Sequence, residues 1–332
     1  MSASPLRRRA LPALILLAGL AGCAGSTTTG AYVPAAAAES RSVALPHDAP
    51  ASGPMAKTAP THWLYVSDYA AGAVKILKNG SYREIGSITS GIANPDGIYL
   101  DKRGNLYVVN QSGPNITEYA PKSTVPSHAY ANNMLTPNSV TTDAYGNVFE
   151  ADFGSGSGGA VNEYYQGLDQ AVRTCSPGST AGGNAGVFGV AVDPNGDVFV
   201  AYALPGSNGG AISEYPGGLK GCPEQTLAIS FGLPTGIALD AAGDLVVPDA
   251  IGHAVDVVAP PYTSVSRTIG SGFTTPWEVT LSKDNNEAFV ADRNGETVTI
   301  VNYTTGANLK VLDSRNGLFT PLGAVDSPNA VY

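Results

Sequence analysis

The chain carries few charged residues, and the basic ones are the scarcer kind. Only 14% of its 332 residues are charged, with 18 Lys and Arg against 27 Asp and Glu. Arg7, Arg8 and Arg9 belong to an N-terminal segment that we expect to be removed, which leaves 15 basic residues against 27 acidic ones, a net charge near −12. No basic cluster remains after that segment. This composition predicts no binding to nucleic acid, and it argues against electrostatic adhesion of the folded domain to anionic lipid.

The N-terminal apolar run, residues 10–21, is too short to span a bilayer. It follows the three arginines and ends in L-A-G-C, with the cysteine at Cys23, and this resembles a bacterial lipobox. The resemblance implies cleavage before Cys23 and lipid attachment to that residue. The alternative is an ordinary signal peptide with an incidental cysteine. Because Ala24, which is not acidic, follows Cys23, the resemblance favours the outer membrane if the host has two membranes.

Three segments follow from this pattern. Residues 1–22 are predicted to be a lipoprotein signal peptide. Residues 23–61 are rich in Ala, Ser, Thr and Pro without a sustained apolar period, so we expect the lipidated cysteine to be followed by a flexible tether. Residues 62–332 are predicted to form one domain outside the cytoplasm, anchored to the membrane only through its lipid.

Cysteine and histidine are rare as well. Besides Cys23 the chain has Cys175 and Cys222, an even pair in an exported protein, so either one disulfide or two separate buried thiols is expected. Only four histidines are present, and only His253 lies in a loop that could approach a site in the domain. The sequence contains no Cys–His pair, no nucleophile elbow and no phosphate loop.

Glycine and proline are abundant, with 40 and 24 residues, and they occur within a repeated phrase. Residues 95–110 read P-D-G-I-Y-L-D-K-R-G-N-L-Y-V-V-N, two alternating runs around a turn with Asp101 and Gly104, which is typical of a β-hairpin. Related phrases begin at Pro137, Val187, Pro234 and Pro276, and each is followed by two further short apolar runs. Four strands per unit, at a period of roughly 42 to 50 residues, predict propeller blades.

The two ends of the domain complete one another. Residues 63–68 match a second strand without a first strand before them, and residues 321–325 match a first strand with nothing after it. We therefore predict an all-β, six-bladed β-propeller with four antiparallel strands per blade, closed by the C-terminal strand pairing with the N-terminal blade. Such closure leaves no free sheet edge in the ring.

Aspartates recur in every blade, and repetition indicates structure because an active site is needed once. Asp101, Asp143, Asp193 and Asp240 are predicted to cap hairpin turns. The acids that end the second strands are also expected to be mainly turn formers. Two of them, Asp152 and Asp292, are kept as candidate general bases.

The repeats disagree at the mouth of the central channel, and there a binding site would be added to a regular scaffold. The residues after the blade-opening position are Asp96, Asn138, Phe188, Thr235, Trp277 and Leu322. Glu278 adds a second acid where other blades have Gly or Ser. Residues expected in the loops just outside are Asp152, Phe153, Tyr202, Asp292 and Arg293. From these we predict a ligand-binding set of Asp96, Asn138, Phe153, Phe188, Tyr202, Trp277, Glu278 and Arg293.

The repeat P-x-G-[IV]-x-x-D-x-x-G-[ND]-[LV]-[YF]-V resembles that of the NHL-repeat and SMP-30/gluconolactonase group of six-bladed propellers. In that group a divalent cation, often Ca²⁺, lies at the channel mouth, so the resemblance implies Asp96, Asn138 and Glu278 as metal ligands. The chain departs from the group in two respects. It lacks the N-terminal E-G-P-x-W ligand motif, and Leu322 stands at the comparable position.

Two functions are therefore expected. The favoured one is a non-catalytic, monomeric lipoprotein without a cofactor, whose channel mouth recognises a protein or glycan of the cell envelope. Exposed aromatic residues such as Trp277 and Phe188 would stack on sugars or fill a partner's pocket. The alternative is a metal-dependent hydrolase or lyase of the gluconolactonase type, in which a cation polarises a carbonyl and Asp292 or Asp152 acts as base.

Overall fold

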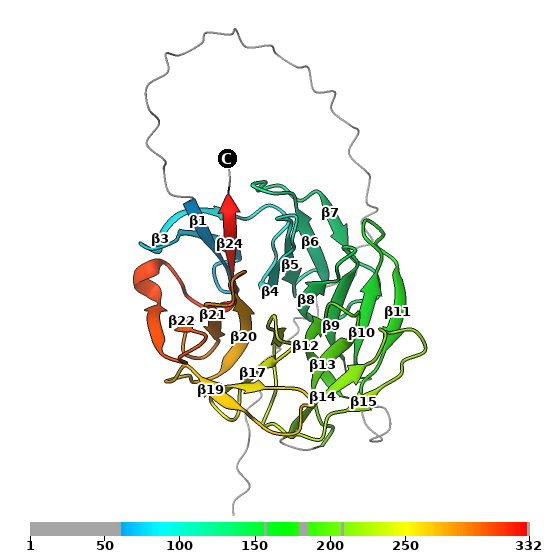
Figure 1. Ribbon diagram of the computed structural model, residues 1–332. Helices are drawn as coiled ribbons and strands as arrows, with labels where there is room; N and C mark the ends of the chain where they lie inside the picture. The colour runs from blue at the N-terminus through cyan, green and yellow to red at the C-terminus, as the bar shows by residue number, and fades with distance from the viewer. Residues whose placement is uncertain (1–60, 156–157, 179–184, 207–208, 331–332) are drawn as a thin grey trace, which may run out of the picture. The chain divides into compact units, whose positions relative to one another are not determined.

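The computed structural model describes residues 61–155, 158–178, 185–206 and 209–330, within a compact unit that spans Lys57–Tyr332. Within these ranges six four-stranded antiparallel sheets are arranged as blades around a ring (Figure 1). The predicted signal peptide, Cys23 and the tether lie outside the described residues. In the part that the structure describes, no helix is long and apolar enough to cross a membrane.

Each blade is lettered here in chain order, and its strands are given from the centre of the ring outward. Blade A consists of β24 (Pro321–Ala330), β1 (Thr61–Asp68), β2 (Ala73–Lys78) and β3 (Arg83–Ile88). Blade B consists of β4 (Pro95–Leu100), β5 (Leu106–Asn110), β6 (Asn115–Tyr119) and β7 (His128–Tyr130). Blade C consists of β8 (Pro137–Thr142), β9 (Val148–Ser155), β10 (Gly158–Tyr164) and β11 (Ala171–Cys175).

The other three blades follow the same order. Blade D consists of β12 (Gly186–Val192), β13 (Val198–Ala203), β14 (Gly210–Tyr215) and β15 (Gln225–Thr226). Blade E consists of β16 (Ala238–Leu239), β17 (Leu245–Asp249), β18 (Ala254–Val258) and β19 (Arg267–Ile269). Blade F consists of β20 (Pro276–Leu281), β21 (Glu287–Asp292), β22 (Thr297–Asn302) and β23 (Asn308–Leu312), after which a 3₁₀ turn (Ser314–Asn316) leads to β24.

The predicted fold and its closure are confirmed. The C-terminal strand β24 pairs antiparallel with β1, with Tyr65 opposite Val325 and Val66 opposite Ala324, so both chain ends contribute to blade A. In Figure 1 the red β24 lies beside the blue β1. This pairing covers the edge of β1 that would otherwise be unpaired.

Blade E departs from the regular pattern. Its first strand was expected from Pro234, yet β16 is only two residues long, and Pro234 forms a single bridge with Asp249. At this point the amide of Gly236 donates to the carbonyl of Trp277 in blade F over 2.8 Å. Blades B, C, D and F also have a register shift at the equivalent place, but their first strands include the residues before it.

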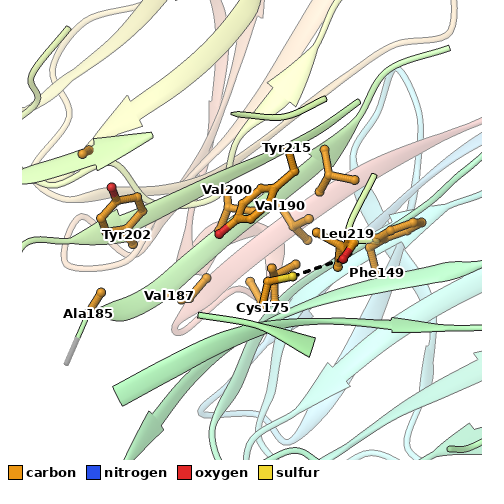
Figure 2. Packing of buried hydrophobic residues seen from close by; sticks show 13 residues of the cluster. Phe149, Cys175, Ala185, Val187, Val190, Val200, Tyr202, Tyr215 and Leu219 are labelled. Carbon is orange, nitrogen blue, oxygen red and sulfur yellow. Dashed lines mark hydrogen bonds between the residues drawn. The ribbon is translucent and has the colours of Figure 1, made fainter. Parts of the chain in front are cut away.

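The hydrophobic core lies between neighbouring blades. Between blades C and D, for example, Phe149 packs in one cluster with Val187, Val200 and Tyr215, all of them buried (Figure 2). Valine and aromatic residues suit this arrangement because they pack well on the pleated faces of strands. Each blade thus packs against its neighbours around the ring.

One position of the second strands is apolar in five blades and acidic in blade C. Glu150 in β9 is fully buried at the place where the other five blades carry Val66, Val108, Val200, Val247 and Val290. Its Oε2 accepts a hydrogen bond from Asn162 over 2.9 Å, and its Oε1 has no partner among the described residues. Burial, together with the nearby charge of Asp152, raises the pKa of Glu150 well above its usual value.

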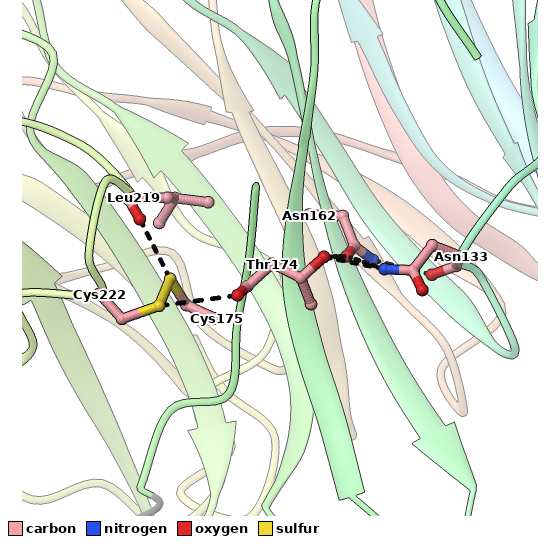
Figure 3. Close-up of a disulfide and its surroundings, with 6 residues drawn as sticks. All are labelled: Asn133, Asn162, Thr174, Cys175, Leu219 and Cys222. Atoms are coloured by element: carbon pink, nitrogen blue, oxygen red, sulfur yellow. Dashed lines mark hydrogen bonds between the residues drawn. A yellow bond between two sulfur atoms is a disulfide. The ribbon is translucent and has the colours of Figure 1, made fainter. Parts of the chain in front are cut away.

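A disulfide joins blades C and D. Cys175 at the end of β11 and Cys222 in the loop after β14 are bonded, with their Cα atoms 5.6 Å apart (Figure 3). The pairing that the sequence left open thus connects two neighbouring blades across 47 residues of chain. A cross-link of this kind stabilises mainly by restricting the unfolded chain.

The two ends of the ring are built from different loops. On the turn face, the loops join the first strand of a blade to the second and the third to the fourth. There Asp101 Oδ1 accepts the amides of Arg103 and Asn105, each over 2.8 Å, and Gly104 has a φ of 85°. The same capping recurs at Asp143, Asp193 and Asp240. On the opposite, mouth face, the loops precede the first strands and follow the second strands.

Candidate functional site

Asp96 is a buried acid that links two blades at the channel mouth. It follows Pro95 at the start of β4 and is only 1% exposed. Its Oδ1 accepts a hydrogen bond from the indole Nε1 of Trp277 over 3.0 Å, and its Oδ2 accepts one from Nε2 of Gln111 over 2.5 Å. Blades B and F are thereby joined across the mouth by one carboxyl group.

Burial dominates the electrostatics of this carboxyl. It raises the pKa of Asp96 to about 7, against the opposing effects of the Trp277 hydrogen bond, the Arg293 charge and the Gln111 hydrogen bond. The second acid, Glu278, has a pKa well above its usual value, because it is buried and lies near Asp96. The mouth therefore holds two carboxyl groups that are held toward their neutral form.

Glu278 fills the space that glycines leave open near the axis of the ring. Its Oε2 accepts the amide of Ile98 over 3.2 Å. A Cβ atom added to Gly323 would lie 2.1 Å from this oxygen, and one added to Gly97 would lie 3.1 Å from Oε1. The carboxyl of blade F thus touches blades A and B, and Cβ atoms on their glycines would crowd it.

A cavity of about 340 Å³ continues beyond Glu278 toward the turn face. It is the central channel, because residues from the innermost strands of all six blades line it. Glu278 and Ser139 lie at its end toward the mouth, and Lys102 and Lys283 lie at the opposite end. Glu278 therefore separates the mouth from the channel.

Gln111 is a site residue that the sequence analysis missed. Its Nε2 donates both to Asp96 Oδ2 and, over 3.2 Å, to Asn138 Oδ1. It is the first residue after the second strand of its blade, at the position equivalent to Phe153 and Arg293, where the repeats also differ. Comparing that position across all blades would have found it.

The residues named as metal ligands are brought near one another without forming a metal shell. Asp96 and Asn138 face the same amide group of Gln111, whereas Glu278 accepts a backbone amide. Among the described residues no group of three or more His, Cys, Asp or Glu side chains is arranged to hold a metal ion. The donor oxygens therefore meet protein N–H groups, and they do not fit a Ca²⁺ shell of six to eight oxygens in this arrangement.

Aromatic residues form a row across the mouth. The ring of Phe188 lies 5.2 Å from that of Phe153 and 5.6 Å from that of Trp277, the latter edge to face. The exposed guanidinium of Arg293 covers Trp277 at 4.7 Å. Trp277 itself is only 9% exposed, so Arg293 and the half-buried Phe153 and Phe188 make up the accessible part of the row.

Three mouth positions offer nothing to a ligand. Tyr202, expected in an outer loop, lies within β13 and is 1% exposed, because it packs in the core between blades C and D. The prediction that Tyr202 lies in a loop at the mouth and contacts a ligand is therefore wrong. Thr235 is fully buried and donates to the carbonyls of Pro248 and Pro276, and Leu322 is buried.

The candidate bases Asp152 and Asp292 clamp loops. Asp152 lies in β9, and its carboxylate accepts the amides of Leu135, Thr136 and Gly154. Asp292, at the end of β21, does the same for Thr274, Thr275 and Gly295. Asp68 and Asp249 repeat the arrangement in blades A and E. His253, the one histidine near this face, is exposed and bonded to the carbonyl of Thr274.

No protein-family model matches the sequence, and no curated protein matches it. Solved structures do match. A chain from a nidogen/laminin complex is 15% identical, with a TM-score of 0.64 over 80% of this chain and 98% of that one. A protein from Bacteroides caccae is 11% identical, with a TM-score of 0.59 over 81% and 99%. Hydrazine synthase of Kuenenia stuttgartiensis is 15% identical, with a TM-score of 0.55 over 76% and 80%. Likeness at this identity concerns the fold alone, and with the closed ring of six sheets it identifies the chain as a six-bladed β-propeller.

Proposed function

We propose that this protein is a lipid-anchored, extracytoplasmic propeller that binds a protein of the cell envelope through its mouth face. The observation that carries the proposal is the row formed by Phe153, Phe188 and Trp277 under Arg293. Aromatic residues and arginine are the types enriched at the energetic centres of protein interfaces. Within the row, Trp277 is held by its hydrogen bond to Asp96.

Exposed apolar side chains surround the row on the same face. Leu135 and Phe319 are 57% and 55% exposed, and Ile251 is 48% exposed. Their backbone amides are held by the clamping aspartates, so the side chains are presented from fixed loops. Such tips suit pockets on a folded partner better than they suit the hydroxyl-rich surface of a glycan. The nidogen/laminin complex is a case in which a chain of similar fold occurs in a protein complex.

The mouth supports binding better than acid–base chemistry. A general base needs a carboxylate that can reach a substrate proton. Asp152 and Asp292 are each occupied by three backbone amides, and Asp96 is occupied by two side-chain donors. None of the three is directed at an accessible ligand position.

The anchor and location are part of the proposal. The lipobox-like ending at Cys23 supports lipid attachment, and Ala24 favours the outer membrane in a host with two membranes. A single propeller on such an anchor would act as a monomer toward its partner. Mass spectrometry of the membrane fraction tests the anchor, because acylation adds the mass of lipid chains to a peptide that begins at Cys23, whereas an unmodified N-terminus would contradict it.

Site-specific photo-cross-linking in intact cells tests the partner. A benzophenone amino acid at Phe153 reports on the mouth face, and one at Tyr145, which is 80% exposed on the turn face of the same blade, is the matched control. We expect a discrete adduct with one protein from Phe153 and none of that mass from Tyr145. Equal adducts from both positions, or an adduct with glycan only, would contradict a protein-binding mouth.

A metal-dependent hydrolase or lyase is the second candidate. One observation favours it, namely that Asp96 and Asn138 oxygens both face the single NH₂ group of Gln111. A thermal melt with EDTA, Ca²⁺, Mg²⁺ or Zn²⁺ tests it, since a ligand that binds only the folded state raises the midpoint. A Ca²⁺-specific rise that is lost in Asp96→Asn would support this candidate, and an unchanged midpoint would count against it.

A further inference from the structure

The central cavity of about 340 Å³ is closed at its mouth end and open at the turn face. At the mouth end the blades nearly touch, because a Cβ atom on Gly97 of blade B would lie 2.4 Å from the carbonyl oxygen of Asn138 in blade C. Blades D and E approach each other as closely, and Glu278 occupies the space that is left. At the other end the wall includes the exposed Lys102 and Lys283. The cavity is therefore a pocket that solvent enters from the turn face.

The wall of the pocket presents aliphatic side chains at its rim and below it. The last residues of four innermost strands line the rim and are half-buried, namely Leu100, Val192, Leu239 and Leu281. Two positions earlier in the same strands, buried residues such as Ile98, Val190 and Val279 continue the wall inward. Aliphatic surface that remains in contact with water in a pocket can be covered favourably by an apolar group of a ligand.

The same wall carries the free edges of the innermost strands. Each of these strands is the end strand of its sheet, so the N–H and C=O groups of its other edge face the channel. Near the mouth, a neighbouring blade satisfies such groups, since Gly236 donates to the carbonyl of Trp277. Between Glu278 and the rim, no backbone hydrogen bond joins one innermost strand to the next among the described residues, although the side chain of Thr280 donates to the carbonyl of Ala324. The wall therefore offers hydrogen-bonding groups as well as aliphatic surface.

The charges around the entrance favour an uncharged ligand. The five turns that join first strands to second strands carry more acids than bases, which disfavours an anion. Their acids are Asp101, Asp143, Asp193, Asp197, Asp240, Asp244 and Asp284, and their bases are Lys102, Arg103 and Lys283. A cation is disfavoured in turn, because Lys102 and Lys283 themselves line the pocket, and burial raises the pKa of Glu278 at its closed end. The neutral carboxyl group of Glu278 has an O–H that can donate a hydrogen bond.

We infer that this pocket binds an uncharged peptide of roughly two or three residues in an extended conformation. An extended peptide matches the wall, because its amides form hydrogen bonds along a strand edge while its side chains pack on aliphatic surface. The depth also fits, since an innermost strand rises by three residues from Glu278 to Leu281, which is about 10 Å. A volume of about 340 Å³ is typical of small-molecule pockets. The pocket opens opposite the mouth, so this inference does not rest on the mouth as a protein-binding face.

Isothermal titration calorimetry with uncharged probes tests the pocket. The mature chain from residue 23 with Cys23→Ser, which cannot be acylated, is titrated with acetyl-valyl-alanine amide, with its analogue methylated on the peptide nitrogens, and with octanol. We expect the capped peptide to bind, and the methylated analogue to bind at least about tenfold more weakly because it has lost hydrogen-bond donors. Octanol, which has an aliphatic chain without amides, should also bind at least about tenfold more weakly. Absence of peptide binding, or equal or tighter binding of either other probe, would overturn the inference.

A variant that fills the pocket shows where the peptide binds. Ala238 in β16 lines the pocket and is half-buried, so Ala238→Leu should reduce peptide affinity at least about tenfold. Ala144→Leu is the matched control and should leave the affinity unchanged, because Ala144 is exposed in the turn between β8 and β9, outside the pocket lining. If Ala238→Leu does not fold, Leu239→Ser at the rim should reduce the affinity about tenfold. Unchanged affinity in the folded pocket variant would overturn the inference. Because the cross-linking at Phe153 probes the opposite face, the two proposals fail independently.

Discussion

The two faces of the propeller use acidic residues in opposite ways. On the turn face, Asp284 is exposed to water, and hydrogen bonds from Ser282 and Asn286 lower its pKa. On the mouth face, burial raises the pKa of Asp96 to about 7 and that of Glu278 well above its usual value. Four turn-face aspartates recur at one position and cap turns, namely Asp101, Asp143, Asp193 and Asp240. Asp96 and Glu278 occur once each and lie at the candidate site.

The largest expected effect is on the pH dependence of stability. Because the folded pKa of Asp96 lies above its unfolded value, the folded state keeps a proton that the unfolded state has lost, and stability falls as the pH rises from about 4 to about 7. Asp96→Asn should remove a decline of about 4 kcal/mol in the free energy of unfolding over that window. Urea unfolding at several pH values measures it.

The turn face supplies the control for this experiment. Asp284→Asn should change stability in the opposite direction with pH, and by less than about 0.5 kcal/mol, because solvent screens an exposed group. If the free energy of unfolding of Asp96→Asn and of the wild type changed in parallel with pH, Asp96 would not differ from the turn-face acids in the way we expect.

The aspartates that bind the mouth loops should contribute more to the free energy of unfolding than the aspartates that cap the turns. Asp249→Ala leaves four amides of the mouth loops without their acceptor and should cost about 3 kcal/mol. The donors are Gly232, Leu233, Ile251 and Gly252. Asp193→Ala on the turn face should cost about 1 kcal/mol, because water reaches its amides. Equal losses in the free energy of unfolding, measured with urea, would show that the two kinds of aspartate contribute equally to stability.

Trp277 links packing to the Asp96 carboxyl. Trp277→Phe keeps an aromatic ring beside Phe188 and removes the N–H donor, so it should cost about 1.5 kcal/mol and raise the pKa of Asp96 further. Chemical denaturation measures the first effect, and the pH midpoint of the stability profile measures the second. A variant with wild-type stability at all pH values would mean that the hydrogen bond contributes nothing.

Glu150 is a buried acid away from the mouth. It therefore tests whether a buried carboxyl group can affect stability without affecting partner binding. Glu150→Val introduces the residue of the other five blades and should stabilise the protein by about 1 kcal/mol at pH 7, with no effect on partner binding. Thermal unfolding and the cross-link from Phe153 check the two parts. Loss of the cross-link would show that Glu150 shapes the mouth after all.

The fold was predictable because five copies of one phrase carry the strand period and the turn residues, and the two chain ends supply the strands of the sixth blade. From the sequence, the mouth could be predicted only as a set of positions, and the contacts between its side chains could not be predicted. Burial decided the outcome at Tyr202, which the blade interface covers, and at Asp152 and Asp292, which the loop amides occupy.

The most direct test of a recognition site at the mouth compares partner affinity between the two faces. Once the protein cross-linked at Phe153 is identified, its affinity is measured for Phe153→Ser with Phe188→Ser, and for Tyr145→Ser as the turn-face control. Both mouth residues are half-buried and neither makes the Asp96 bond, so the fold should survive. We expect the affinity to fall at least about tenfold for the mouth variant and to stay unchanged for the control. Unchanged affinity in a folded mouth variant would contradict it.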